Sequence, residues 1–480
     1  MPLKAKILDS KVASRAMSTK YNEVIKPLKD DEPEDVVFNS LYGLRTVELN
    51  RPKKLNSLNG SMIRKIVPRL IEWEKSDLAN VVVMKGAGDR ALCAGGDVKA
   101  LSDLNKKGPQ GQQESIDYFG LEYKLDHLIA TYKKPYIAFM DGVTMGGGVG
   151  LSLHAPFRLA TERTVFAMPE TTIGFFPDVG ASFFLPRLAG SVGTYLALTS
   201  EQLRGANVFY TGIATHYLHS STLAKLESRL AELRFRDYDD TRKRLEIIEM
   251  TIEEYATGLP PLDREPILIA GELRNAIDRC FGKATVAEIM QALEQEQGPT
   301  REWAQKTLTT LQKRSPTSVH VALRQMQVGR EWSITETFQK EHEIAAQFMR
   351  HPDFVEGVDK QLSKERGTPQ WQPASLADVH ESGQDVAGPF FQDGASGVEK
   401  LQTLVDRDYD EYPHLYVGVP TEKDVERAVK GASRSKRQIA DDFVQLKKGR
   451  QGVRTIVEEI LARKTYESGE GAATWVDATS

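Results

Sequence analysis

The sequence of 480 residues contains only two cysteines and no long apolar run. Cys93 and Cys280 are too few for a disulfide framework or a thiolate zinc site, and such scarcity is typical of a reducing compartment. No apolar stretch approaches the ~20 residues that a membrane-spanning helix needs, so we expect no membrane insertion. The formal net charge of -4 excludes a global positive field, so nucleic acid could bind only at a local patch.

The sequence also lacks the glycine motifs of several common chemistries. It contains no GxxxxGK[ST], no GxGxxG after a predicted strand and no GxSxG. These absences remove the usual sequence support for a phosphate-binding loop, a dinucleotide-binding fold and a serine hydrolase. No residues have the spacing of metal ligands, so we expect neither a metal ion nor a separate cofactor.

The first half of the sequence alternates between strand and helix patterns. The segment "DVVFNSLYGLRTVELN" predicts a β-hairpin that turns at Tyr42 and Gly43. The segments "NVVVMKG" and "KKPYIAFMDG" are short buried strands that end in glycine, and helical patterns lie between and after them. This alternation predicts an α/β fold with parallel strands, whose carboxyl ends are the usual place for ligands.

Composition divides the chain into four regions. Residues 1–35 form a tail that is basic and poor in acids until Asp30, which is typical either of a mitochondrial transit peptide or of a frayed basic tail. Residues 36–212 form the α/β core, and residues 213–371 form a helical region. Residues 372–480 begin as a linker rich in Pro, Gly, Ser and Asp, and continue as a helical extension with Thr421 as a predicted N-cap.

Two glycine-rich segments follow predicted buried strands and open predicted helices: "CAGGD" at 93–97 and "MGGGVG" at 145–150. Glycine lets a backbone approach a ligand closely, and the start of a helix offers unpaired N–H groups. Two such donors that converge on one oxygen would make an oxyanion hole. The alternative is that both segments are ordinary tight turns.

Two carboxylates, Glu170 and Asp178, lie in the apolar segment "MPETTIGFFPDVG". An ionised carboxylate that is removed from water costs several kcal/mol unless it is paired or hydrogen-bonded. Both carboxylates therefore either perform chemistry or accept backbone N–H groups at a turn or a helix start.

The segments "ALCAGGD", "DGVTMGGGVGLSLHAPFRLATERTVFAMPETTIGFFPDVG" and "GANVFYTGIATHYL", in this order, resemble the crotonase superfamily. Within it, residues 36–371 most resemble the hydrolases of 3-hydroxyisobutyryl-CoA in valine catabolism. The resemblance implies a spiral of ββα units followed by a helical region. It also implies that the chain hydrolyses a short 3-hydroxyacyl-CoA to the free acid and coenzyme A.

The resemblance also implies roles for individual residues. Backbone N–H groups of Gly96 and Gly147 would hold the thioester oxygen as an oxyanion hole. The hydratases of the superfamily carry a catalytic glutamate where this chain has Gly150, and this departure argues against simple hydration. Their second glutamate is matched by Glu170.

The resemblance further assigns catalysis to Glu170 and Asp178, and substrate binding to these two together with Glu122 and Gly147. Glu170 would act either as a base toward water or as a nucleophile, and the sequence leaves both open. Asp178 would orient the water or the substrate hydroxyl. Glu122 would line the pocket, although it could instead be a solvated residue of its helix.

Five other residues invite a functional interpretation. We expect Cys93 to be a small buried residue rather than a nucleophile, and His154 to be structural rather than a ligand. Lys53, Lys54 and Lys99 lie near the loops that would face the phosphates of coenzyme A, but solvated surface lysines are an equal alternative.

The C-terminal extension carries a basic segment between Lys430 and Arg454. Such a segment could bind RNA phosphates, although a solvated helix face is the commoner meaning. A small-subunit protein of fungal mitochondrial ribosomes resembles the same hydrolases, so the alternative function is a structural role there, with or without activity. We therefore expect a mitochondrial protein whose partners are an acyl-CoA substrate, copies of itself, or mitochondrial ribosomal RNA and proteins.

Overall fold

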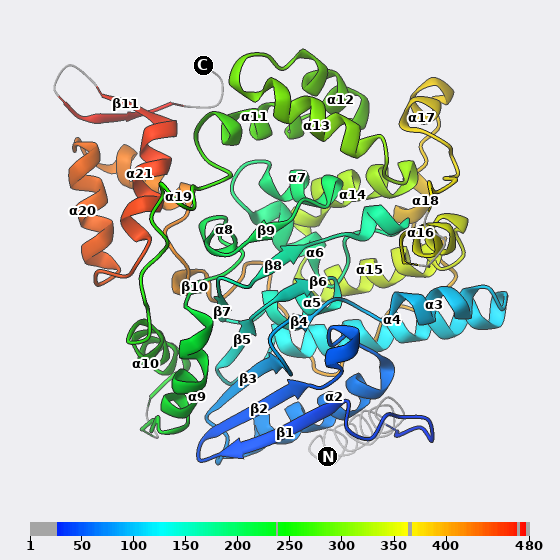
Figure 1. Cartoon of the computed structure of the whole chain (residues 1–480), viewed down its shortest axis with the longest axis horizontal. Coiled ribbons are helices and arrows are strands. Elements are labelled where there is room, and N and C mark those ends of the chain that lie inside the picture. Colours follow the sequence, from blue (N-terminus) through cyan, green and yellow to red (C-terminus); the bar gives the residue numbers. More distant parts are fainter. Residues whose placement is uncertain (1–25, 237–238, 363–366, 468–470, 477–480) are drawn as a thin grey trace, which may run out of the picture.

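The computed structural model describes residues 26–236, 239–362, 367–467 and 471–476 (Figure 1). The predicted N-terminal tail or transit peptide spans residues 1–35, and its residues 1–25 lie outside the described residues. Among the described helices, none is both long and apolar enough to cross a membrane.

Two β-sheets form the centre of the molecule, one of six strands in the order β1-β2-β3-β5-β7-β10 and one of four in the order β4-β6-β8-β9. The strands of the larger sheet are β1 (Val36–Leu41), β2 (Leu44–Leu49), β3 (Val81–Gly86), β5 (Tyr136–Met140), β7 (Phe157–Ala160) and β10 (His216–Tyr217). Those of the smaller sheet are β4 (Ala91–Cys93), β6 (Val143–Met145), β8 (Val165–Ala167) and β9 (Leu203–Arg204).

The predicted hairpin is confirmed. Strands β1 and β2 pair antiparallel, with Leu41 opposite Leu44, so the chain turns at Tyr42 and Gly43 as expected. From β2 through β3, β5 and β7 to β10 all neighbouring strands are parallel.

The strands confirm the predicted spiral of ββα units. After β3 the chain places β4 in the smaller sheet, and it repeats this step from β5 to β6 and from β7 to β8. Helices follow the first two of these pairs: α3 (Val98–Asn105) and α4 (Pro109–Ala130) after β4, and α5 (Gly147–Leu153) after β6. The carboxyl ends of β4 and β6, which are parallel neighbours, therefore carry the two glycine-rich segments side by side.

The remaining helices cover the sheets and extend from them, and Figure 1 shows their arrangement. They are α2 (Gly60–Lys75), α6 (Ala181–Phe184), α7 (Val192–Thr199), α8 (Ala206–Tyr210), α9 (Leu223–Ala231), α10 (Thr241–Glu253), α11 (Gly271–Phe281), α12 (Val286–Gln295), α13 (Arg301–Leu311), α14 (Pro316–Val328), α15 (Ile334–Phe348), α16 (Pro352–Leu362), α17 (Leu376–Ser382), α18 (Gly388–Phe391), α19 (Glu422–Gly431), α20 (Lys436–Leu446) and α21 (Val453–Lys464).

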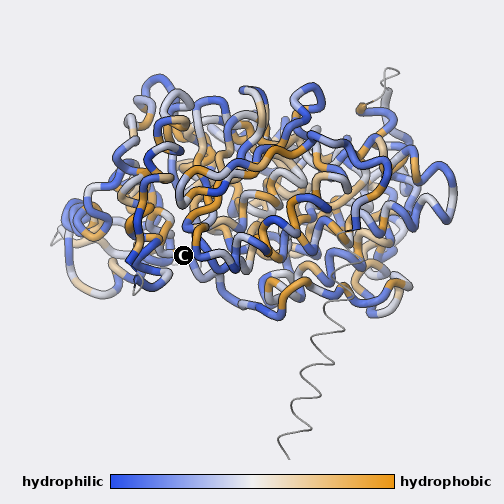
Figure 2. The backbone as a smooth tube through the Cα atoms, turned by 90° about the horizontal axis from the view of Figure 1, so that it is seen from below, coloured by the Kyte–Doolittle hydropathy of each residue, from blue (hydrophilic) through white to orange (hydrophobic). Residues whose placement is uncertain are grey.

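Short 3-10 helices link these elements, and the small hairpin β11 (Thr465–Glu467) and β12 (Ala473–Trp475) follows α21. Hydrophobic residues concentrate in the interior of the molecule, and hydrophilic residues lie mostly at its periphery (Figure 2). A large core unites α2, α4, α7 and α15, and a smaller core lies between the six-stranded sheet and α9 and α10. Glu122 of α4 lies within the larger core rather than on a solvated face.

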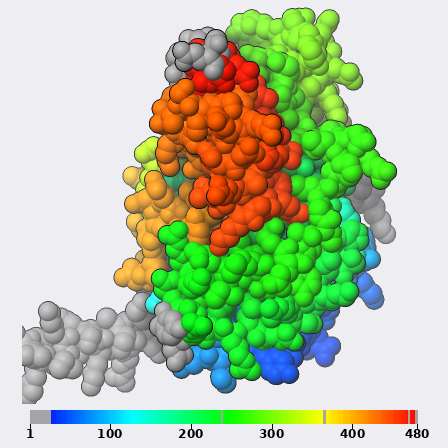
Figure 3. Space-filling view, turned by 90° about the vertical axis from the view of Figure 1, so that its left-hand side faces the viewer, coloured from blue at the N-terminus to red at the C-terminus, as the bar shows by residue number. Residues whose placement is uncertain are grey.

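The C-terminal extension packs against the rest of the molecule. Helices α19 to α21, drawn in orange and red, lie over the green helical region in Figure 3. The predicted cap is present, because Thr421 and Asp424 form a reciprocal capping box at the start of α19. Arg450 is a buried residue of the loop that joins α20 to α21, and it forms an ion pair with Glu249 of α10 at 2.9 Å.

The predicted linker also contacts the core. Arg407 forms an ion pair with Glu74 of α2 at 2.7 Å, and its carbonyl oxygen accepts a hydrogen bond from His127 of α4. Strand β10 joins the larger sheet a few residues after the expected end of the α/β core at residue 212. The division into four regions stays a prediction, but the regions after residue 212 contact the core closely.

Candidate active site

The two glycine-rich segments lie against each other at the carboxyl ends of β4 and β6. A Cβ on Gly146 would lie 3.4 Å from the Cα of Gly95, and a Cβ on Gly147 would lie 3.3 Å from the Gly96 nitrogen. Gly147 is the first residue of α5, so its N–H has no partner within the helix. The structure therefore brings the two predicted oxyanion-hole residues together.

Helix α4 packs its carboxyl groups against the glycines of α5. A Cβ on Gly147 would come within 2.4 Å of Glu122 Oε1, and one on Gly150 within 2.6 Å of Asp126 Oδ2. Side chains at positions 147 and 150 would therefore overlap with the two carboxyl groups. A side chain at either position would therefore displace one of these carboxyl groups.

Glu170 reaches the glycine-rich segments from the chain that follows β8. It begins a 3-10 helix, Glu170–Ile173, that follows β8, and its Oε1 would lie 3.2 Å from a Cβ on Gly146. Glu122 and Glu170 are only 2% and 4% exposed. One oxygen of each, Glu122 Oε1 and Glu170 Oε2, is buried without a hydrogen-bond partner among the described residues. Buried polar atoms of this kind are rare unless a ligand or water completes them.

Asp178 completes the group of predicted carboxylates. Its side chain is 4% exposed, and Oδ2 accepts a hydrogen bond from the Tyr123 hydroxyl of α4 at 2.7 Å. Because Tyr123 directly follows Glu122 in α4, one helix positions both the Glu122 carboxyl and the donor to Asp178.

The turn after Asp178 is strained and firmly held. Val179 has a φ of 56°, which β-branched residues rarely adopt. Its carbonyl oxygen accepts a hydrogen bond from His154 Nε2 at 2.9 Å. Glu341 of α15 accepts the N–H of Gly180 at 2.6 Å and that of Ser182 at 2.9 Å. Strained backbone of this kind persists where the surroundings over-determine it, as they commonly do at functional sites.

Burial raises the pKa of Glu122, Glu170 and Asp178, and repulsion adds to the rise for the two glutamates. The pKa of Glu122 and that of Glu170 lie well above the ordinary value, first because of burial and then because of the Asp178 charge. Burial raises the pKa of Asp178 to about 7, although the Tyr123 hydrogen bond opposes the rise. Groups that titrate near neutral pH suit proton transfer in catalysis.

Phenylalanine side chains close the interior next to these groups. Phe119 of α4 stacks on Phe175 with ring centroids 5.0 Å apart, and Phe176 stacks on Phe348 at 5.5 Å. Phe175 and Phe176 lie in the sequence between Glu170 and Asp178, which explains the apolar character of that segment. An apolar wall excludes water and so strengthens electrostatic interactions within the site.

Other sequence candidates do not join the site. Burial raises the pKa of the Cys93 thiol to about 12, which leaves it un-ionised and agrees with a structural role. Burial lowers the pKa of His154 to about 4, so the imidazole is neutral and Nε2 carries the proton given to Val179. Lys54 pairs with Asp97 at 3.1 Å and Lys99 with Asp103 at 2.7 Å, while Lys53 is exposed.

Sequence reasoning missed three residues of this interior: Asp126, Tyr123 and Glu341. Asp126 lies one turn after Glu122 in "GLEYKLDHL", and this spacing was the available signal, but it is also typical of a solvated helix face. Nothing in the sequence around Glu341 distinguishes it from the other charged residues of its helix.

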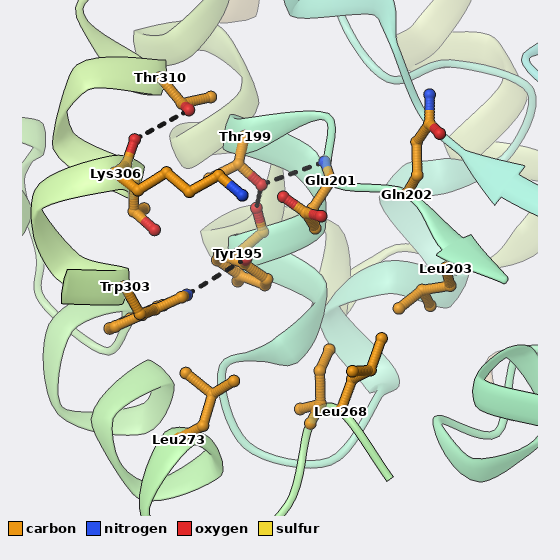
Figure 4. Close-up of a pocket in the computed structure, with 12 residues that line it drawn as sticks. Tyr195, Thr199, Glu201, Gln202, Leu203, Leu268, Leu273, Trp303, Lys306 and Thr310 are labelled. Carbon is orange, nitrogen blue, oxygen red and sulfur yellow. Dashed lines mark hydrogen bonds between the residues drawn. The ribbon is translucent and has the colours of Figure 1, made fainter. Parts of the chain in front are cut away.

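A separate cavity of about 170 Å³ lies between α7 and α13 (Figure 4). The Lys306 ammonium and the Glu201 carboxylate lie at one end of it, and Leu268, Leu273 and Trp303 at the other. None of the predicted site residues lines this cavity. We therefore place the candidate chemistry at the buried carboxyl groups, where unpartnered polar atoms and two glycine-rich segments meet.

The basic segment of the extension is largely engaged within the molecule. Arg454 pairs with Asp441 at 2.6 Å and Arg434 pairs with Asp442. The Lys447 ammonium donates to two backbone carbonyl oxygens before α19, at 2.6 and 2.9 Å. Arg437, in contrast, has a 90% exposed side chain. These contacts leave less free positive charge than the sequence suggests.

Comparison with known proteins identifies relatives of two kinds. The family model described as enoyl-CoA hydratase/isomerase matches residues 44–387. The small ribosomal subunit protein mS47 of Neurospora crassa is 54% identical over 475 residues, covering 98% of this chain and 92% of that protein. The mitochondrial 3-hydroxyisobutyryl-CoA hydrolase of Gallus gallus is 41% identical over 351 residues, covering 73% of this chain and 88% of that protein.

A solved structure agrees with the observed fold. The carnitinyl-CoA dehydratase from Mycobacterium thermoresistibile has a TM-score of 0.63 and 33% sequence identity. The match covers 75% of this chain and 96% of that one. The predicted fold is thereby confirmed.

Proposed function

The chain belongs to the enoyl-CoA hydratase/isomerase family, and we propose that it hydrolyses the thioester of a short 3-hydroxyacyl-CoA, with 3-hydroxyisobutyryl-CoA as its substrate. It is a mitochondrial protein, as its hydrolase relatives are by name. The observation that carries the proposal is that Glu122 and Glu170 converge on the two adjoining glycine-rich segments, with Asp178 near enough for its charge to raise the pKa of both.

In this proposal the thioester oxygen accepts hydrogen bonds from the N–H groups of Gly96 and Gly147. These donors stabilise the negative charge that grows on the oxygen in the transition state, and one such donor is typically worth ~10² to 10³ in rate. The charge develops in a water-poor interior, where fixed dipoles act most strongly.

Glu170 then works at the carbonyl carbon in one of two ways. As a base it takes a proton from a water molecule that attacks the carbon; as a nucleophile it attacks the carbon itself and forms an anhydride that water then opens. In both cases coenzyme A leaves as a thiol after it gains a proton. Asp178, held by Tyr123, orients the water or the substrate hydroxyl.

Hydrolysis is favoured over hydration because position 150, where the hydratases of the superfamily carry a catalytic glutamate, is glycine in this chain. Position 150 carries no carboxylate, and the adjacent volume is filled by the Asp126 carboxyl of α4. A residue at position 150 therefore contributes no second water-activating group beside Glu170.

The proposal is tested by following coenzyme A release with a thiol reagent. We expect the unchanged chain to release coenzyme A from 3-hydroxyisobutyryl-CoA. The variants Glu170→Gln and Asp178→Asn should each lower kcat by a factor of at least about 10². The control Glu114→Gln alters an exposed carboxylate of α4 and should leave kcat unchanged. Isobutyryl-CoA, which lacks the hydroxyl, is expected to react with a kcat/KM about 10² or more lower, because a buried carboxyl loses its partner. A chain that hydrates an enoyl-CoA but releases no coenzyme A contradicts the proposal.

We also propose a second function, a structural role in the mitochondrial small ribosomal subunit, with or without retained hydrolysis. Its support is the mS47 relative, whose match spans 98% of this chain and so includes nearly all of the C-terminal extension. Self-association and binding of ribosomal RNA stay predictions.

The second function is tested by co-sedimentation with mitochondrial small subunits. Deleting the basic segment is a poor test, because Arg450 pairs with Glu249 of α10 and so holds the extension to the rest of the molecule. The double charge reversal Arg437→Glu with Lys448→Glu instead changes exposed residues, and Lys225→Glu with Lys283→Glu is its control.

Weaker binding of the first double variant alone assigns RNA binding to the basic segment. If both double variants bind equally well, the basic segment takes no part in binding. If the unchanged chain does not co-sediment with the small subunits, the ribosomal role is contradicted.

A further inference from the structure

Residues 407–412, which we call the bracing segment, contact several elements that surround Asp178. The segment follows residues 44–387, which the family model matches, so family membership assigns it no role. It is described throughout and forms neither helix nor strand. The Tyr409 ring lies edge-on to Phe183 of α6 with ring centroids 5.3 Å apart, and α6 begins directly after the turn that follows Asp178. Its other contacts include hydrogen bonds to α15, to the end of α5 and to α4.

The bracing segment holds the start of α15. The Asp408 carboxylate accepts the backbone N–H of Thr335 at 2.9 Å and the hydroxyl of Ser333, the N-cap of α15, at 2.7 Å. The carbonyl oxygen of Tyr409 accepts the N–H of Ile334 at 2.9 Å. The first N–H groups of a helix have no partner within it, so these acceptors satisfy donors that the helix itself leaves open. The segment therefore fixes the place where α15 begins.

Helix α15 connects that contact to the turn after Asp178. Glu341, about two turns into α15, accepts the N–H of Gly180 at 2.6 Å and that of Ser182 at 2.9 Å. The Glu341 side chain is 0% exposed. Rigid secondary elements carry displacements between sites, so a shift at the start of α15 moves the acceptor of the two amides beside Asp178.

Tyr412 holds a second support of the same turn. Its hydroxyl donates to the Ala155 carbonyl oxygen at 2.7 Å and lies 3.2 Å from the His154 carbonyl oxygen. His154 in turn donates from Nε2 to the Val179 carbonyl oxygen at 2.9 Å. The backbone that carries the imidazole is thereby fixed by the bracing segment, and the imidazole fixes the residue next to Asp178.

The bracing segment also contacts α4, which carries the hydrogen-bond donor to Asp178. The Arg407 carbonyl oxygen accepts a hydrogen bond from His127 Nε2 at 3.1 Å. His127 lies one turn after Tyr123 in α4, and the Tyr123 hydroxyl donates to Asp178 at 2.7 Å. Six consecutive residues therefore contact α4, the end of α5, α6 and α15, which together surround Asp178 and its turn.

We propose that Asp408 and Tyr412 are positioning residues, and that the bracing segment holds Asp178 in its catalytic place through α15 and the end of α5. This inference rests on the proposed hydrolysis for its catalytic meaning. The turn has strained backbone at Val179, and strained backbone keeps its conformation only where the surroundings hold it. Loss of a support lets the turn relax and moves the carboxyl group. Misplacement of a reacting or orienting group by about 1 Å can cost on the order of 10² in rate.

Point variants of the full chain test the proposal. Asp408→Ala removes the acceptor at the start of α15, and Tyr412→Phe removes only a hydroxyl. Asp424→Ala is the matched control for the first, because Asp424 also accepts an N–H and a threonine hydroxyl at the start of a helix, α19, in the same extension. Tyr466→Phe, on a ring that is 57% exposed, is the control for the second. The kcat and KM of coenzyme A release from 3-hydroxyisobutyryl-CoA are measured for each.

Asp408→Ala and Tyr412→Phe should each lower kcat by about 10 to 10² with little change in KM, whereas both controls match the unchanged chain. Asp408→Asn keeps one acceptor oxygen and should recover part of the loss. In a chain that already carries Asp178→Asn, Asp408→Ala should lower kcat no further, since the segment acts through the Asp178 carboxyl group. A loss of folded protein would lower the rate in both backgrounds, so this comparison separates positioning from stability.

Hydrogen exchange reports on the turn without any substrate. The Gly180 and Ser182 amides are held by Glu341. The peptide 177–184 should therefore exchange about fivefold faster, or more, in Asp408→Ala, a factor that corresponds to the loss of one helix cap. In Asp424→Ala its exchange should equal that of the unchanged chain.

Two results would overturn the proposal: an Asp408→Ala variant whose kcat stays within about twofold of that of Asp424→Ala, or a loss that is equally large in the Asp178→Asn background. If Asp408→Ala fails to fold, Asp408→Asn and Tyr412→Phe decide by the same two comparisons. If the unchanged chain releases no coenzyme A, the proposed hydrolysis fails and hydrogen exchange decides alone. Faster exchange in Asp408→Ala only then supports the bracing role, and equal exchange in Asp408→Ala and Asp424→Ala overturns it.

Discussion

Substitution of Gly147 by alanine is expected to reduce catalysis with little loss of stability. An alanine Cβ would come within 2.4 Å of Glu122 Oε1 and 3.3 Å of the Gly96 nitrogen. Carbon and oxygen atoms do not approach so closely without bonding, so the Glu122 carboxyl must retreat by about 1 Å. The new methyl group also intrudes between the two N–H groups that we assign to the oxyanion hole.

The expected loss follows from these distances. A displacement of about 1 Å in a positioning group costs on the order of 10² in rate, and the loss of one oxyanion donor costs a similar or larger factor, so kcat should fall by about 10² to 10⁴. Stability should change by less than about 1 kcal/mol, because the flexible end of Glu122 can move and alanine favours the helix over glycine by a similar amount.

The neighbouring glycine provides the matched control. A Cβ on Gly148 would come within 2.2 Å of the Cys93 carbonyl oxygen, which is backbone and cannot move aside. Gly148→Ala should therefore lower the melting temperature, whereas Gly147→Ala should lower kcat at an almost unchanged melting temperature. Coenzyme A release and thermal unfolding measure the two effects. A Gly147→Ala variant with kcat/KM within about threefold of the unchanged chain would refute this interpretation of the glycine segments.

Three other substitutions test separate parts of the structure. Tyr123→Phe removes the hydrogen bond that holds down the pKa of Asp178, so the limb of the pH profile that reports Asp178 ionisation should move from about 7 to higher pH; an unmoved limb would exclude Asp178 from that titration. Gly180 has a φ of 87°, and the Cβ of Gly180→Ala would lie 2.4 Å from the His154 ring. Urea unfolding should therefore show a loss of about 1 to 3 kcal/mol in the free energy of unfolding. Unchanged stability would contradict the packing of this turn. Arg450→Ala removes the buried partner of the partly exposed Glu249 and Glu253 of α10, and the free energy of unfolding should fall by about 1.5 to 3 kcal/mol. The extension should then be cleaved early by protease, and resistance equal to that of the unchanged chain would contradict the anchoring role.

Much of the fold follows from local patterns in the sequence. The hairpin at Tyr42 and the strands that end in glycine have short β-branched runs bounded by turn residues, which strongly predict strands. The glycine-rich segments follow strands and open helices, a pattern that predicts either an oxyanion hole or ordinary tight turns. The structure brings them together because β4 and β6 are parallel neighbours.

The parts that were missed depend on burial, which the sequence does not reveal. Asp126 was missed because it forms, with the predicted Glu122, the spacing of an exposed charged helix face, yet α5 covers that face of α4. The contacts of Arg407 lie in a stretch without periodicity, so its packing on α2 and α4 gave no local signal. The charge of the basic segment was visible, but its partners were not, since Arg450 pairs with a residue about 200 positions earlier.

The central claim is that the buried carboxyl groups and the two glycine-rich segments form a thioester hydrolase site. The most direct test is the rate of coenzyme A release from 3-hydroxyisobutyryl-CoA by the purified chain, measured beside its Glu170→Gln variant. We predict release by the unchanged chain and a rate at least about 10² lower in the variant. Equal rates in the two proteins, or no release by either, would contradict the claim.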